Sequence, residues 1–169
     1  MEIRGANFLY TLAGLMITFA GFSALLLTVR AATGAKLSLL DRYLAKTVMT
    51  HIFVLAAAAL LPALLGLYDV QEPWIWRVSA VLFAVPMLSL QVTYPYRRRK
   101  VIGKAVPRAI LAVFVIVGAV VTVAMLGCIL SGFQYSAAAY ITALTVDFFT
   151  VAFAFLVALE VILQQATEV

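Results

Sequence analysis

Five long apolar stretches restrict what this chain can fold into. Each holds about 20 or more residues with few charges, which is the length that an α-helix needs to cross the hydrocarbon core of a bilayer. Only 11% of the residues are charged, against about 25% in soluble domains. We therefore predict an all-α integral membrane protein, a bundle of five transmembrane helices. The predicted spans are residues 7–29, 49–68, 74–94, 109–130 and 136–163.

The segments between the spans complete a single predicted transmembrane domain over residues 1–169. Within 37–48, leucines recur at a spacing of three to four residues opposite charged side chains. This pattern predicts a short amphipathic surface helix between the first and second transmembrane helices. Ser38 and Asp41 have the spacing of a capping box at its start, with Asp in place of the usual Glu or Gln. Residues 96–108 are predicted to form a basic cytoplasmic loop.

The cations lie mainly on one side of the predicted bundle. In a five-span protein the first and third connections share a side, and they hold ten of the twelve Lys and Arg residues. The positive-inside rule then places this side and the C-terminus in the cytoplasm, with the N-terminus outside. As a class, the chain resembles the small multi-pass proteins of bacteria, which implies a multi-pass protein of the cell inner membrane. The net charge of +5 therefore reflects topology, and nucleic acid is not expected as a partner.

The densest group of cations comprises Arg97, Arg98, Arg99, Lys100 and Lys104. Such a cluster beside a membrane helix is able to bind anionic lipid headgroups. It is more simply explained as a topology signal alone, because the positive-inside rule already predicts it. The sequence leaves both interpretations open.

A carboxylate, Asp147, lies near the middle of the fifth span. An ionised and unpaired carboxylate at that depth costs several kcal/mol, so it marks a candidate functional site. Three hypotheses remain open. Asp147 serves as an ion or proton site, or its protonated carboxyl holds helices together by a hydrogen bond, or it docks a partner subunit that carries a cation.

Hydroxyl groups are the expected polar neighbours of this carboxyl. At a rise of about 1.5 Å per helical residue, Thr18 falls at a similar depth in its own span, and Thr122 falls about one turn further out. Thr150 shares the helical face of the carboxyl in a stripe of Ala and Thr residues. Phe148 and Phe155 are expected on the opposite side of the helix. The predicted ion- or proton-interacting set is therefore Asp147, Thr150, Thr18 and Thr122.

The only histidine of the chain, His51, falls near the start of the second predicted span. Glu160 falls near the same membrane boundary in the fifth span. The two residues therefore form a possible pH-sensitive pair, since imidazole titrates near neutral pH. The alternative is that both face water or lipid headgroups.

Neither an enzyme nor a metal protein is expected. We find no Gly-rich phosphate loop, no Gly-x-Ser-x-Gly and no His-Glu-x-x-His pattern in the sequence. One Cys and one His are too few for the usual zinc sites. We therefore predict no catalytic residue, no metal ligand and no cofactor.

The predicted function is a small channel or transporter for ions or protons that uses the carboxyl of Asp147. We expect a homo-oligomer, because five short spans enclose little space. Gly14, Thr18 and Gly21 lie roughly on one face of the first span and are suited to close helix packing. The alternative is a non-transporting accessory or scaffold subunit, which would bind a larger membrane-protein complex. In either case the lipid bilayer, including its anionic lipids, is the surrounding partner.

Overall fold

The computed structural model describes residues 3, 5–32, 38–103, 108–130 and 136–167, and their side chains except those of 30, 109, 158 and 160–167. This part of the chain is helical and holds no strand. Its helices are α1 (Ala6–Ala32), α2 (Leu39–Gly66), α3 (Glu72–Ile102), α4 (Arg108–Leu130) and α5 (Ser136–Thr167). All 5 contain a stretch long and apolar enough to cross a membrane, which confirms the prediction of five such helices.

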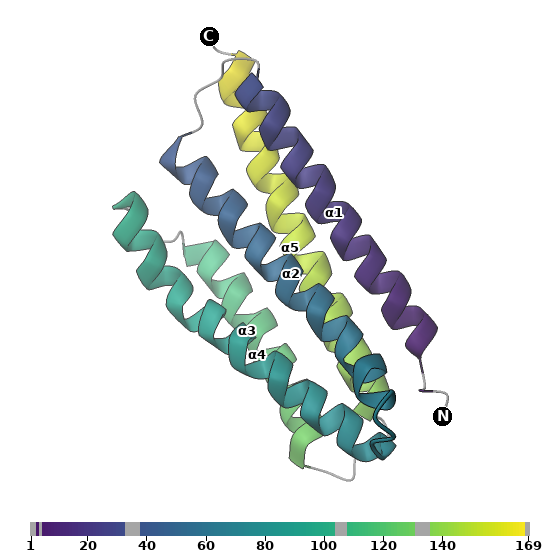
Figure 1. Ribbon diagram of the computed structural model, residues 1–169. Helices are drawn as coiled ribbons and strands as arrows, with labels where there is room; N and C mark the ends of the chain where they lie inside the picture. The colour runs from purple at the N-terminus through teal and green to yellow at the C-terminus, as the bar shows by residue number, and fades with distance from the viewer. Residues whose placement is uncertain (1–2, 4, 33–37, 104–107, 131–135, 168–169) are drawn as a thin grey trace.

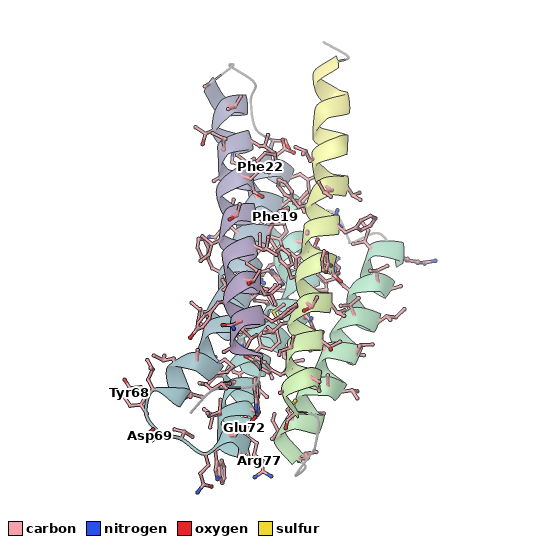
Figure 2. All side chains as sticks on the ribbon, turned by 90° about the vertical axis from the view of Figure 1, so that its right-hand side faces the viewer. Phe19, Phe22, Tyr68, Asp69, Glu72 and Arg77 are labelled. Atoms are coloured by element: carbon pink, nitrogen blue, oxygen red, sulfur yellow. The ribbon has the colours of Figure 1, made fainter. Side chains whose placement is uncertain are left out.

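The helices alternate in direction, and the two termini lie at opposite ends of the bundle (Figure 1). α2 packs against α1, α3 and α5, and α4 packs against α3 and α5. One end of the bundle, where α2 begins and α3 ends, carries Arg42, Lys46 and Arg97; we call it the basic end. The other end carries the turn between α2 and α3, where Asp69, Glu72 and Arg77 lie (Figure 2).

α2 begins earlier than the second predicted span. The Ser38 hydroxyl accepts from the Asp41 backbone N–H at 3.1 Å, and the Asp41 carboxylate accepts from the Ser38 N–H at 2.9 Å. This confirms the predicted capping box. From Leu39 the helix continues without interruption to Gly66, so 39–48 forms the first turns of α2. A separate surface helix is therefore not seen in the described residues, because nothing after the cap breaks the helical backbone.

α3 ends later than the third predicted span. It passes through Pro95 and continues to Ile102, so residues 96–102 of the predicted basic loop are helical. The helix stops at Gly103, whose φ of 74° lies in the left-handed region and whose N–H donates to the Arg99 carbonyl. Glycine favours this helix-ending geometry because it lacks a Cβ. Pro95 removes one backbone N–H, which the helix tolerates.

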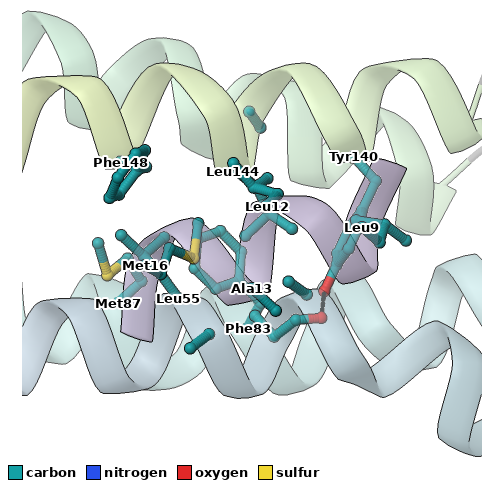
Figure 3. Packing of buried hydrophobic residues seen from close by; sticks show 14 of the residues in the cluster. Leu9, Leu12, Ala13, Met16, Leu55, Phe83, Met87, Tyr140, Leu144 and Phe148 are labelled. Carbon is teal, nitrogen blue, oxygen red and sulfur yellow. Dashed lines mark hydrogen bonds between the residues drawn. The ribbon is translucent and has the colours of Figure 1, made fainter. Parts of the chain in front are cut away.

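Aromatic and aliphatic side chains fill the core between α1, α2, α3 and α5 (Figure 3). Phe19 of α1 makes edge-to-face contacts with Phe148 and Phe155 of α5, at ring-centroid distances of 5.9 and 5.4 Å. In contrast, the small residues Gly14 and Gly21 are exposed on α1, and a Cβ added at either would meet nothing within 4 Å. The small-residue stripe therefore does not pack within this chain.

Candidate functional site

α5 turns one face toward the core, and Asp147 lies in the middle of that face. Asp147 exposes only 3% of its surface, and its Oδ2 atom has no hydrogen-bond partner in the described part of the chain. The expected separation of this carboxyl from the phenylalanines is wrong, because the rings of Phe148 and Phe155 are buried on the same face, against α1. The buried residues follow at helical spacing: Tyr140, Ala143, Leu144, Asp147, Phe148, Val151 and Phe155.

A hydrogen bond between α5 and α2 fixes how these helices are aligned. Pro62 has no N–H, so the carbonyl of Ala58 one turn earlier lacks its usual helical donor. The Tyr140 hydroxyl donates to this carbonyl at 2.8 Å, drawn as a dashed line in Figure 3. Both residues are buried, so the bond satisfies a carbonyl that has no access to solvent.

This alignment places His51 at the level of Asp147. α2 and α5 run in opposite directions (Figure 1). Asp147 lies seven residues beyond Tyr140, and His51 lies seven residues before Ala58. Seven residues make nearly two helical turns, about 10 Å along the axis, so each residue stays close to the face of its reference. Asp147 and His51 are therefore at one level, on the faces that the Tyr140–Ala58 hydrogen bond joins.

His51 is as deeply buried as Asp147, at 3% exposure. Its Nδ1 lies 2.9 Å from the Thr47 carbonyl, which is able only to accept, so Nδ1 carries the proton in this contact. In a neutral imidazole the other nitrogen, Nε2, is then a bare acceptor. Nε2 is buried and has no hydrogen-bond partner among the described residues. His51 and Asp147 thus each present one unpartnered atom to the core.

A third buried polar group is Ser79, on the face of α3 that is turned toward Tyr140. The rings of Trp76 and Phe83 lie 5.8 and 6.3 Å from the Tyr140 ring, so this face of α3 is turned toward Tyr140. Ser79 stands between these two residues at helical spacing, exposes 0% of its surface, and has no hydrogen-bond partner for Oγ in the described structure. Neither Ser79 nor Tyr140 belongs to the site residues predicted from the sequence.

The three predicted threonines each bond to their own helix. The hydroxyls of Thr18, Thr122 and Thr150 donate to the carbonyls four residues earlier, at 2.8, 2.7 and 2.8 Å. Thr18 is exposed, whereas Thr122 and Thr150 are partly buried. Their donors are thus satisfied locally, and no hydrogen bond to Asp147 is found for them among the described contacts.

The alignment of α2 and α5 separates His51 from Glu160. Glu160 lies 20 residues beyond Tyr140, whereas His51 lies only seven from Ala58. The difference of thirteen residues corresponds to about 20 Å along the helix axis. The Glu160 side chain is outside the described residues, and the backbone levels do not favour the predicted His51–Glu160 pair. Arg77 lies far from His51 and Asp147. Its guanidinium is 5.3 Å from the Trp74 ring, at the end of the bundle opposite the basic end (Figure 2).

A cavity of about 350 Å³ opens between α2 and α3 at the basic end. It is lined by cations from both helices and by Thr47, the residue whose carbonyl accepts from His51. Of the predicted lipid-binding cluster, Arg97 and Lys100 line the cavity and Arg98 and Arg99 do not; Lys104 is outside the described residues. The lining cations are Arg42, Lys46, Arg97 and Lys100.

These features define an all-helical protein whose five described helices are long and apolar enough to span a membrane. Among the described residues, no three His, Cys, Asp or Glu side chains come together in a way that would hold a metal ion. Comparisons with protein-family models, with curated proteins and with solved structures each found no match.

Proposed function

We propose that the five helices span the cell inner membrane, with the basic end in the cytoplasm and the N-terminus outside. The proposal is supported by the length and apolar character of the helices. It is also supported by the chain order, because ten of the twelve cations fall within residues 30–46 and 97–108, where helices end and begin at the basic end.

We infer that the protein moves protons across this membrane and that Asp147 and His51 are the groups that exchange them. The observation that carries this inference is the pair of unpartnered atoms, Asp147 Oδ2 and His51 Nε2, buried at one level of the bundle. A carboxyl and an imidazole both gain and lose protons near neutral pH in suitable surroundings. Ionisable groups at membrane depth are typical of proton relays.

Three further polar residues lie beside this pair: Thr47 on the side of the basic end, and Tyr140 and Ser79 on the side of the opposite end. On the basic side, Nδ1 of His51 donates to the Thr47 carbonyl, a contact that orients the imidazole and does not itself carry protons. On the opposite side, Tyr140 lies about two helical turns from Asp147 on α5, and Ser79 lies on the face of α3 that is turned toward Tyr140. The proposal therefore requires a chain of several waters over this distance, because one water bridges only groups within hydrogen-bond reach of it. In this proposal Nε2 of His51 takes up a proton from water on the basic side and releases it to the carboxylate of Asp147, whereas Nδ1 keeps the proton that it donates to the Thr47 carbonyl.

We propose further that the protein acts as a homo-oligomer. The stripe of Gly14, Thr18 and Gly21 is exposed on α1, and its small side chains would allow a second helix to approach closely. The competing function is an accessory or scaffold subunit of a larger membrane complex, in which Asp147 has a structural role.

Proton flux in liposomes separates the two functions. The purified protein is reconstituted with a pH-sensitive dye inside the vesicles, and a potassium diffusion potential is applied. We expect the lumen to acidify faster than in protein-free liposomes prepared in parallel. Equal rates in the two preparations, together with stable stoichiometric association with another membrane protein, would instead establish the accessory function.

A further inference from the structure

The cavity at the basic end combines positive charge with an apolar wall. Arg42 and Lys46 stand one turn apart on α2, and Arg97 and Lys100 stand one turn apart on α3. Among the described residues that line the cavity, none is acidic. Four cations from two helices therefore face one space of about 350 Å³. Such an arrangement repels cations and attracts a ligand with concentrated negative charge.

Hydrogen-bond donors in the cavity belong mainly to the cations. The hydroxyls of Thr47 and Thr50 donate to carbonyls of their own helix at 2.8 Å, and the Tyr43 hydroxyl donates to the Tyr94 carbonyl at 3.3 Å. These hydroxyls therefore offer only acceptor lone pairs to a ligand. The ligand that fits is one whose oxygens accept from guanidinium and ammonium groups.

The guanidinium of Arg97 is oriented by a hydrogen bond within α3. One of its terminal nitrogens donates to the Leu90 carbonyl at 3.2 Å, which orients the guanidinium. Its Nε is buried and has no hydrogen-bond partner within the described structure. A buried guanidinium donor without a partner is costly, and phosphate oxygens match the planar donor geometry of arginine.

The remaining wall of the cavity is aliphatic, formed by Leu39, Leu90 and Val101. A free inorganic anion gains nothing from these side chains. A lipid, in contrast, places its charged phosphate among the cations and its glycerol and upper acyl chains against the aliphatic wall. Basic pockets between membrane helices at the cytoplasmic side commonly hold anionic headgroups in this way.

We propose that this cavity binds the phosphate group of an anionic phospholipid between α2 and α3. This site is distinct from the predicted attraction of anionic lipid to the basic cluster as a whole. It includes Arg42 and Lys46 of α2, and it does not include Arg98 and Arg99. It is also independent of proton movement, since a protein that carries no protons would bind the lipid equally well.

The test measures binding of fluorescent phosphatidylglycerol to the purified full-length protein in detergent micelles, with phosphatidylcholine as the neutral reference. The double variant Lys46→Gln/Arg97→Gln should lose at least about tenfold in affinity, because each cation near a headgroup contributes about fivefold. The matched control, Arg99→Gln/Arg108→Gln, removes the same charge outside the cavity and should change affinity by less than about twofold. The single variant Lys46→Gln, at an exposed side chain, gives the same comparison if the Arg97 variant does not fold.

Three results would overturn the proposal. Equal losses in the cavity and control variants would show a general electrostatic attraction. Unchanged binding in the cavity variants would show that the lipid binds elsewhere. Complete displacement of phosphatidylglycerol by millimolar inorganic phosphate would assign the cavity to a soluble phosphate. Retained binding in excess phosphate, with the loss confined to the cavity variants, supports the lipid site.

Discussion

Replacing Asp147 by Asn should reduce proton flux in reconstituted liposomes by about 100-fold or more. Asparagine has nearly the shape of aspartate and keeps its capacity for hydrogen bonds, but its amide does not exchange a proton in the relevant pH range. The variant therefore removes the chemistry at this position and leaves the packing of α5 in place. The initial rate of lumen acidification, normalised to the amount of reconstituted protein, is the quantity to compare.

The matched control for this variant is Glu160→Gln, which changes the other acid of the α5 membrane segment by the same isosteric step. It should retain most of the flux, because Glu160 lies about 20 Å further along the helix than Asp147. Full flux in the Asp147→Asn protein would remove Asp147 from the mechanism even though transport itself were real. A loss in the Glu160 variant alone would move the proton-exchanging site toward the basic end.

Replacing Tyr140 by Phe should lower the free energy of unfolding by about 1–3 kcal/mol, because it leaves the Ala58 carbonyl buried without a donor. The cost should fall sharply in a Pro62→Ala background, since the substituted alanine supplies the backbone N–H that this carbonyl otherwise lacks. Denaturant titration of the detergent-solubilised protein, followed by helical circular dichroism, gives both values.

The double-mutant cycle isolates the role of the hydrogen bond itself. We expect a coupling energy of about 1 kcal/mol or more between positions 62 and 140. An equal cost of Tyr140→Phe in both backgrounds would mean that the hydroxyl does not compensate for the proline. The alignment of α2 with α5 would then rest on packing alone.

The number and nature of the helices were predictable because each is an unbroken apolar stretch. The start of α2 and the end of α3 were not predicted correctly, and local chemistry explains both differences. The cap at Ser38 starts a helix that simply continues into the second apolar stretch, so amphipathic and apolar segments merge into α2. The third predicted span ends at residue 94, where the apolar stretch gives way to the basic segment, but α3 continues to Ile102, and Gly103 provides the backbone conformation that terminates the helix.

Asp147 was recognisable from sequence because a carboxylate in an apolar stretch is rare. That Asp147 and His51 lie at one level was not recognisable, for two reasons. The late predicted start of α2 placed His51 at the membrane boundary, and the hydrogen bond from Tyr140 to Ala58 aligns helices 82 positions apart in sequence. Such an alignment depends on tertiary contacts, which no local pattern reveals. For the same reason Arg42 and Lys46 were not grouped with Arg97 in one cavity.

The most direct test of the central claim is the titration of the single histidine by nitrogen NMR in the native and Asp147→Asn proteins. With 1 His in the chain, the imidazole signals of His51 need no assignment. If Asp147 and His51 exchange protons as a coupled pair, the pH midpoint of the His51 signals should differ by about one unit or more between the two proteins. The Glu160→Gln protein should titrate as the native one does. Superimposable titrations of native and Asp147→Asn protein would contradict the pairing of Asp147 with His51.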